Sequence, residues 1–162
     1  MAKKVKVYGF RKFAHYDENI TEKILEDFDA DSTVLDVEYF GNDVLDEIFS
    51  GDPDYIIGLG QCPASMGKKL RVEKRAVNWK EPPLSRIEPM GKDELFPNLD
   101  IGDENSIDSS SAGKYVCNYS MYKILDRIDK EKLGTKYAFI HVPEGYDIQK
   151  ARALLQKYID GL

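Results

Sequence analysis

Three residues carry side chains suited to nucleophilic chemistry: Cys117, His141 and Glu73. Cys117 follows the glycine at Gly113, and the apolar residues after it recur at three- and four-residue spacing, which predicts a helix that begins near the cysteine. Free N–H groups and the helix dipole stabilise a thiolate at such a position, and the thiolate is the form of cysteine that attacks carbonyl carbons. Most free cysteines are small buried hydrophobes, so this stretch alone leaves both interpretations open.

His141 lies near the end of the apolar run YAFIHV at 137–142. A core histidine satisfied by the backbone and a catalytic histidine both fit that position. At the carboxyl end of a central parallel strand the imidazole would meet the helix start that carries Cys117, which favours a thiolate–imidazolium pair. A third group usually orients such an imidazole, and Glu73 is a candidate, although its surroundings RVEKR are typical of a solvated face.

The elements that would position these residues alternate along the chain. We predict helices at about 20–28, 42–50 and 147–159 besides the one at Cys117, and strands at 3–8, 34–40, 55–60, 69–79 and 137–142. Residues 80–104 are rich in proline and predict an irregular excursion. This alternation predicts an α/β fold: a single three-layer domain over 1–162, with a mostly parallel twisted sheet and helices on both faces.

Composition narrows the functional classes. The net charge of −6 over 162 residues argues against a nucleic-acid partner, and no apolar run reaches membrane-spanning length, so we expect no membrane partner and a cytoplasmic protein. A reducing compartment would keep Cys62 and Cys117 free. These cysteines and the two histidines lack any compact ligand spacing, so we expect no metal site.

Several segments, in chain order, are similar to the motifs of one family. SSAGKYVCNYSMY at 110–122 resembles a nucleophile motif in which Ala-Gly, an aromatic position and Cys-Asn open a helix, and FIHVP at 139–143 resembles the matching histidine motif. EKRAVN at 73–78, GFRKF at 9–13 and GLGQ at 58–61 resemble further segments of the same proteins. The family is that of the pyroglutamyl peptidases, also called pyrrolidone-carboxylate peptidases, cysteine peptidases that remove an N-terminal pyroglutamate.

The resemblance implies a role for each candidate residue. Cys117 would be the nucleophile, His141 the general base and acid, and Glu73 the group that orients His141. The substrate would be a peptide or a small acyl amide, and no cofactor would be required. The remaining positions implied to bind substrate are an apolar slot, a Gly-Gln near the oxyanion position and the arginine of an Arg-Ile pair: Phe10, Phe13, Tyr115, Val116, Gln61 and Arg86.

The chain also departs from the family pattern, as a shortened and divergent member would. Lys12, Ala14 and His15 are atypical of the first loop, and the 87–106 segment is abbreviated. Because the contact regions are shortened, self-association is expected to be weaker than in longer members. The alternative hypothesis is a catalytically silent or substrate-altered member, which acts as a binding module or as an amidase on another N-terminal acyl group. A reactive Cys117 thiol would support the enzyme, and an inert one the module.

Overall fold

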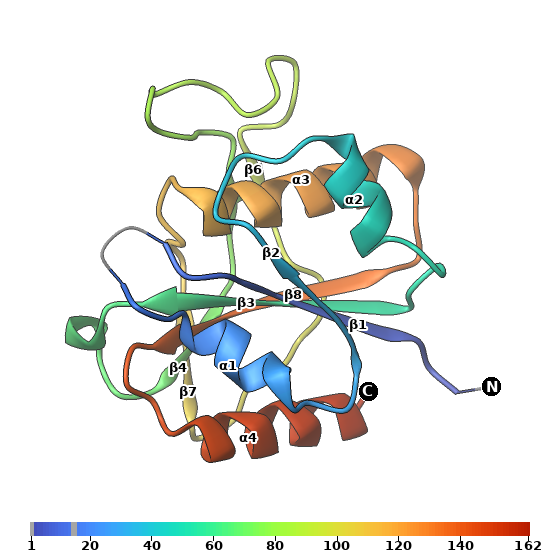
Figure 1. Ribbon diagram of the computed structural model, residues 1–162. Helices are drawn as coiled ribbons and strands as arrows, with labels where there is room; N and C mark the ends of the chain where they lie inside the picture. Colours follow the sequence, from blue (N-terminus) through green and yellow to red (C-terminus); the bar gives the residue numbers. More distant parts are fainter. Residues whose placement is uncertain (1, 14–15) are drawn as a thin grey trace.

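A six-stranded sheet in the order β2-β1-β3-β8-β4-β7 forms the centre of the molecule (Figure 1). The computed structural model describes residues 2–13 and 16–162. In chain order the elements are β1 (Val5–Phe10), α1 (Ile20–Glu26), β2 (Asp31–Leu35), α2 (Asn42–Ile48), β3 (Tyr55–Cys62), the 3₁₀ turn η1 (Ala64–Met66), β4 (Leu70–Glu73), β5 (Ala76–Val77), β6 (Glu94–Leu95), β7 (Ser106–Ser109), α3 (Val116–Glu131), β8 (Lys136–Pro143) and α4 (Ile148–Asp160).

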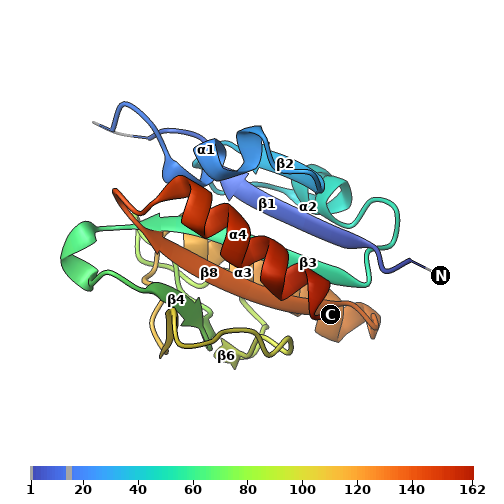
Figure 2. The same cartoon turned by 90° about the horizontal axis from the view of Figure 1, so that it is seen from below.

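Helices cover both faces of this sheet, α1 and α4 on one side and α2 and α3 on the other (Figures 1 and 2). The neighbours β2, β1, β3 and β8 run parallel, as βαβ crossovers require, and β4 pairs parallel with β7. Only the β4–β8 pair is antiparallel among the described strands of this sheet. The predicted three-layer α/β domain with a mostly parallel sheet is therefore confirmed.

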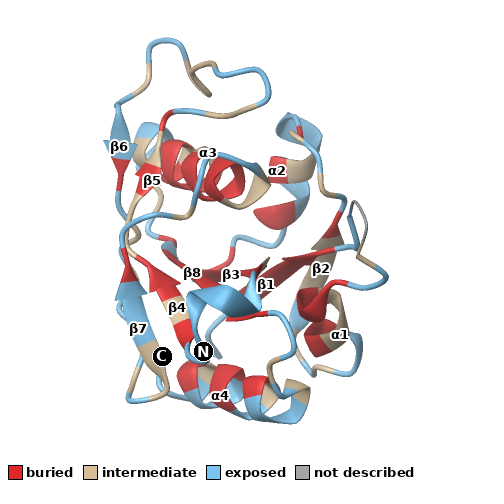
Figure 3. Cartoon of the chain, turned by 90° about the vertical axis from the view of Figure 1, so that its left-hand side faces the viewer, coloured by how far each residue is buried: buried red, intermediate tan, exposed pale blue. Residues whose placement is uncertain are grey.

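Each face of the sheet has its own buried cluster (Figure 3). Val7, Ile57, Leu59 and Ile140 pack against α1 and α4. The alternate strand positions, with larger and more polar side chains, pack against α2 and α3; examples are Tyr8, Tyr137 and Phe139. The separation follows from the strand geometry, because successive side chains point to opposite faces.

Two predicted strands differ from the structure. The strand expected at 34–40 lies earlier, at Asp31–Leu35, and the residues after it form a loop. The strand expected at 69–79 is divided: β4 belongs to the main sheet, whereas β5 pairs with β6 in a small second sheet. The segment between β5 and β6 projects from the body of the molecule above α3 in Figure 1.

The helices and strands near the predicted site match expectation more closely. The helix predicted near Cys117 begins at Val116, and the strand predicted at 137–142 runs from Lys136 to Pro143. No helix in the described part of the chain combines the length and apolar character needed to cross a bilayer.

Candidate active site

The first turn of α3 carries Cys117 into a cavity. Gly113 has a φ of 81°, a value that L side chains rarely adopt, and it turns the chain from β7 toward the helix. The N-cap residue, Tyr115, makes no side-chain hydrogen bond to the first turn. Backbone N–H groups at this helix start are therefore left for a ligand, on the same turn as the half-buried thiol.

Asn118, the residue after the cysteine, fixes this turn to the rest of the molecule. Its side chain accepts a hydrogen bond from the Val77 backbone N–H at 2.9 Å. It also donates to the carbonyls of Val77, at 2.9 Å, and Trp79, at 3.0 Å. The start of α3 is thus tied to β5, and because Asn118 is fully buried these bonds are shielded from water.

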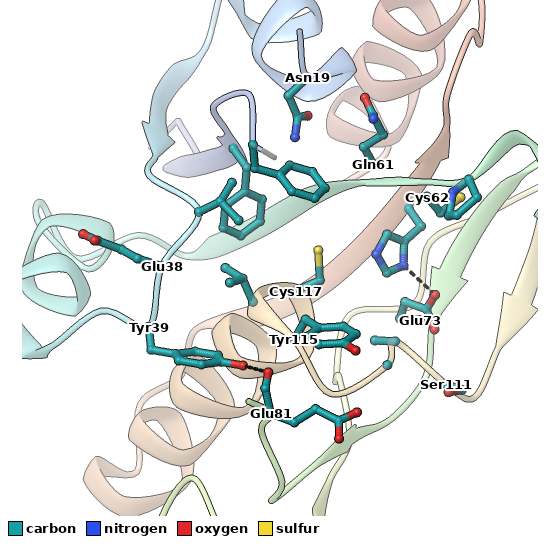
Figure 4. A pocket seen from close by; sticks show the side chains of 18 of the residues that line it. Asn19, Glu38, Tyr39, Gln61, Cys62, Glu73, Glu81, Ser111, Tyr115 and Cys117 are labelled. Carbon is teal, nitrogen blue, oxygen red and sulfur yellow. Dashed lines mark hydrogen bonds and ion pairs between the residues drawn. The ribbon is translucent and has the colours of Figure 1, made fainter. Parts of the chain in front are cut away.

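His141 and Glu73 meet across the antiparallel β4–β8 pair. His141 is directly opposite Arg71, so Glu73 is its diagonal neighbour on the same face of the sheet. The His141 Nδ1 and Glu73 Oε1 atoms are 2.8 Å apart, and Figure 4 marks this contact by a dashed line. Glu73 is 1% exposed, so the solvated face expected from its local sequence is wrong.

Gly60 leaves the space in which the cysteine and the histidine approach each other. A Cβ atom at this position would lie 2.7 Å from Cys117 Sγ and 3.0 Å from His141 Cδ2. Both distances are shorter than ordinary van der Waals contact, so only glycine fits without displacing the pair. The thiol and the imidazole therefore border the same space beside Gly60. Since Nδ1 faces Glu73, the Nε2 atom remains for the thiol.

Two opposing effects set the charge of the imidazole. Burial alone would lower the pKa of His141, because a charged ring is poorly solvated there. The negative charge of Cys117 and the hydrogen bonds to Cys117 and Glu73 outweigh this effect and raise the pKa of His141 to about 9. A protonated imidazole is therefore the favoured state of His141 at neutral pH.

The second cysteine has a different environment. Cys62 ends β3 on the wall of the same cavity, but its side chain is buried. Burial raises the pKa of the Cys62 thiol to about 11. At neutral pH it is almost wholly the unreactive thiol, so within residues 2–13 and 16–162 Cys117 is the cysteine that combines access with a neighbouring imidazole.

The cavity has a volume of about 790 Å³ and is lined mostly by apolar side chains. Cys117, His141 and Glu73 all line it. Of the residues implied to bind substrate, it also contains Phe10, Phe13, Tyr115, Val116 and Gln61. Segments far apart in the sequence thus converge on one apolar hollow beside the thiol (Figure 4).

Gln61 and Arg86 are engaged elsewhere. Gln61 lines the cavity, but its Oε1 accepts a hydrogen bond from the Ile20 backbone N–H at 2.8 Å, at the start of α1. Arg86 does not line the cavity. It pairs with Asp93 at 2.9 Å and lies over the ring of Trp79 in the projecting segment.

The atypical first loop is described only in part. Lys12 is exposed and does not line the cavity. Ala14 and His15 lie outside the described residues.

Other residues of the cavity were not identified from the sequence. Tyr39 was expected in a strand, but it lies in the loop after β2, where its hydroxyl donates to the Glu81 carbonyl and joins two walls of the cavity. Asn19 is the N-cap residue of α1. Its Oδ1 does cap α1 by accepting from Thr21, yet the residue also lines the cavity. Only a knowledge of tertiary contacts could have identified either residue.

No group of three or more His, Cys, Asp or Glu side chains within residues 2–13 and 16–162 is placed to hold a metal ion.

Known proteins share both the sequence pattern and the fold. The family model described as Pyroglutamyl peptidase matches residues 104–151, the segment from β7 into α4 that includes Cys117 and His141. A pyrrolidone-carboxylate peptidase of Saccharolobus solfataricus is 29% identical over 187 residues, covering 96% of this chain and 87% of that protein. One from Oceanobacillus iheyensis is 28% identical over 174 residues, covering 90% and 86%.

Solved structures give the same result. A mutant pyrrolidone carboxyl peptidase from Pyrococcus furiosus superposes with a TM-score of 0.80 at 25% identity, covering 97% of this chain and 96% of that chain. The pyrrolidone carboxyl peptidase from Thermococcus litoralis gives a TM-score of 0.77 at 25% identity, covering 98% and 94%. The alignment with the Saccharolobus protein spans more positions than this chain has residues, so that relative contains internal segments that are absent here.

Proposed function

Because this chain is a shortened and divergent relative of the pyroglutamyl peptidases, we propose that it is a cysteine peptidase that hydrolyses the amide bond after an N-terminal pyroglutamyl residue. The observation that carries the proposal is the placement of Cys117, His141 and Glu73 together on the wall of an apolar cavity. A buried carboxylate, an imidazole and a thiol in that order are the groups that acyl transfer to sulfur requires.

The reaction would begin with attack of the Cys117 thiolate on the pyroglutamyl carbonyl carbon. The tetrahedral oxyanion would be stabilised by backbone N–H groups at the uncapped start of α3, which lie on the same turn as the sulfur. The His141 imidazolium would give its proton to the departing amine. The neutral imidazole would then take a proton from a water molecule, whose attack on the acyl carbon breaks the bond to sulfur, releases pyroglutamate and restores the thiolate and the imidazolium.

Glu73 would act on the imidazole rather than on the substrate. Its Oε1 accepts from Nδ1, which fixes the ring orientation and leaves Nε2 facing the sulfur. Because the pKa of His141 is about 9, the ring would remain protonated at neutral pH until it donates its proton to the leaving amine. The other carboxylate oxygen of Glu73, Oε2, is buried and has no hydrogen-bond partner among the described residues, so the carboxylate is directed to the histidine alone.

The cavity suits a flat lactam better than a charged acyl group. Phe10, Phe13 and Val116 supply apolar walls for the two faces of a five-membered ring. The Oδ1 atom of Asn19 is already occupied by Thr21, so its Nδ2 donors are left for the lactam carbonyl, and Figure 4 shows the Asn19 side chain directed at the cavity. Lys12, the cation that could have selected an acidic substrate, is exposed outside it.

The deciding experiment compares pyroglutamyl, prolyl and glutamyl coumarylamides, with Cys117→Ser as the blank for each. We expect the pyroglutamyl amide to be cleaved and the prolyl amide, which lacks the lactam carbonyl, to be at least about 100-fold slower, because the cavity's donors would be left unpaired. Free pyroglutamate should inhibit competitively. Cleavage of the glutamyl amide alone would reassign the substrate, and no cleavage with an inert Cys117 would favour the binding module.

Such an enzyme needs a reduced thiol, so we propose that it works in a reducing compartment, as the cytoplasm is. We also propose that its partner is the peptide substrate, and that any self-association is weaker than in family members that retain the longer internal segments.

A further inference from the structure

Three hydroxyl groups form a buried chain directly beneath the cysteine. They come from Tyr8 on β1, Ser120 on α3 and Tyr137 on β8, and all three residues are fully buried. The Tyr137 and Tyr8 oxygens are 2.6 Å apart, and the Tyr8 oxygen is 2.8 Å from Ser120 Oγ. Ser120 Oγ is in turn 2.8 Å from the carbonyl oxygen of Cys117.

The last member of the chain fixes the direction of every hydrogen bond. The Cys117 carbonyl can only accept, so the Ser120 hydroxyl donates to it. Ser120 Oγ then accepts from the Tyr8 hydroxyl, and Tyr8 accepts from Tyr137. Each hydroxyl donates once, and all three O–H dipoles direct their positive ends toward residue 117. Consecutive bonds of this kind polarise and strengthen one another in a low-dielectric interior.

The surrounding structure keeps this chain intact. A Cβ at Gly58 would lie 2.5 Å from the Tyr8 hydroxyl, so the glycine provides the space that the phenol occupies. Burial raises the pKa of Tyr8 and of Tyr137 well above the usual value of a tyrosine. Both phenols therefore remain neutral donors at any pH at which a peptidase works.

We infer that Tyr8, Ser120 and Tyr137 are positioning residues for the nucleophile: through the Cys117 carbonyl they hold the first turn of α3 so that the sulfur faces His141. The proposal rests on Cys117 being the nucleophile. It does not rest on the identity of the substrate. Residues 118–121 are also held by packing, by the Asn118 bonds to β5 and by the Tyr119 hydroxyl, which donates to the Phe40 carbonyl, but none of these bonds reaches the central sheet.

The test measures iodoacetamide labelling of Cys117 at neutral pH, with buried Cys62 as a reference in the same molecule. We expect Ser120→Ala to slow labelling of Cys117 about fivefold, the effect of one lost hydrogen bond, while labelling of Cys62 is unchanged. Tyr8→Phe should have a smaller effect and Tyr137→Phe the smallest, since each lies one bond further from the cysteine. Adding Tyr8→Phe to Ser120→Ala should change nothing more, because the link is already broken.

Tyr122→Phe is the matched control. Tyr122 lies on the same helix, is fully buried, and donates its hydroxyl to the Lys92 carbonyl at 2.7 Å, away from the cysteine. We expect it to lower the melting temperature without slowing Cys117. Variants that merely loosen the fold would instead label Cys62 faster. The proposal is wrong if Ser120→Ala and Tyr8→Phe label Cys117 at the wild-type rate, or if Tyr122→Phe slows it equally.

The peptidase assay supplies a second readout. If pyroglutamyl amides are cleaved, Ser120→Ala should lower kcat with little change in KM, because substrate binding does not involve the hydroxyl chain. If no amide is cleaved, the labelling result still decides the positioning role, so failure of the proposed substrate and failure of this inference are separate outcomes. Should Ser120→Ala fail to fold, Tyr8→Phe and Tyr137→Phe, which lose a single oxygen each, provide the same comparison.

Discussion

The two faces of the central sheet are built from alternate residues of the same strands, yet they differ in chemistry. The face toward α1 and α4 consists of aliphatic side chains such as Ile57, Leu59 and Ile140. The face toward α2 and α3 combines glycines, phenols and the pair formed by His141 and Glu73. A buried polar face is costly unless each group finds a partner, so the second face is held together by hydrogen bonds as well as by packing.

The difference shows how the domain separates stability from chemistry. The face toward α1 and α4 contributes to stability through aliphatic packing, and its aliphatic side chains carry no reactive group. On the opposite face, Gly58 and Gly60 have no side chain to bury. The Tyr8 hydroxyl occupies the space beside Gly58, and the Cys117 thiol occupies the space beside Gly60. Substitutions on the aliphatic face should therefore lower mainly the free energy of unfolding, and substitutions on the opposite face should lower mainly activity.

The largest expected effect is on the reactive face, at the cysteine itself. Cys117→Ala should lower peptidase activity by at least about 10⁴-fold, because no other group in the cavity can form the acyl intermediate. Cys62→Ala, a change of similar size on the same cavity wall, should leave kcat/KM within about threefold of wild type, since its thiol is protonated at neutral pH. Comparable losses in the two variants would contradict the assignment of the nucleophile.

The next effect concerns the imidazole and its carboxylate. His141→Ala should reduce kcat about 10³-fold, because both the base and the acid are lost. Glu73→Gln keeps the ring in place through a neutral amide and should reduce kcat only about 10- to 100-fold. Steady-state kinetics on the pyroglutamyl amide measure both, and a larger loss for Glu73→Gln than for His141→Ala would reverse the proposed roles.

Gly60 on β3 tests the space around the cysteine, and its neighbour Leu59 tests the opposite face of the same strand. Gly60→Ala places a methyl group 2.7 Å from the Cys117 sulfur and should reduce kcat about 100-fold, since a displacement of about an ångström is enough for that loss. Gly134→Ala is the control: an added methyl group there has no atom within 4 Å, so kcat should stay at the wild-type value. Wild-type activity in Gly60→Ala would show that the sulfur has more freedom than the geometry allows.

Leu59→Ala tests the aliphatic side of the same strand. Leu59 is buried against α1 and α4, so its truncation should lower the free energy of unfolding by about 3 kcal/mol. Activity of the folded fraction should stay within about twofold of wild type, because the side chain points away from the cavity. Urea denaturation and active-site titration separate the two quantities, and a large fall in kcat would mean that the faces are coupled.

The smallest expected effect is the pH dependence of stability. The pKa of His141 is raised to about 9 from an ordinary value of 6.5, so its stabilising contribution is complete below about pH 6.5 and is lost as the pH rises through 9. Between these limits the melting temperature of the wild type should fall by about 5–10 °C more than that of His141→Gln. Parallel curves for the two proteins would show that folding does not raise the pKa of the histidine.

Long periodic segments were predictable from the sequence, and short segments with few apolar residues were not. Strand β8 and helices α3 and α4 carry continuous or strongly periodic apolar residues, so their identity and approximate limits follow from the sequence. The expected strand at 34–40 fails because Phe40 reaches the core from a loop and Asp31–Ser32 pair with β1 despite their polarity. The position of β2 was set by its hydrogen-bond pairing with β1, and the β-propensity of the local sequence did not determine it.

The candidate site shows the same limit. The motif containing Cys117 and the position of His141 at the end of an apolar strand were visible in the sequence. The burial of Glu73 was not, because its charged neighbours Lys74 and Arg75 pair with acidic residues at the surface while Glu73 itself turns inward. Arg86 was placed by resemblance in a segment whose path depends on contacts such as the one with Asp93, which no local pattern reveals.

The reversed direction of β4 has a consequence for how this architecture tolerates change. Because Glu73 is the last residue of β4 and pairs with Ser109 of β7, its carboxylate is held by the sheet, and residues further along the connections that flank β4 do not determine where it points. Insertions or deletions in those connections can therefore alter the rim of the cavity while the imidazole keeps its orientation. A domain of this design can lose whole peripheral segments, as the alignment with the longer Saccharolobus protein indicates for this chain, and still present the same reacting atoms to a new substrate.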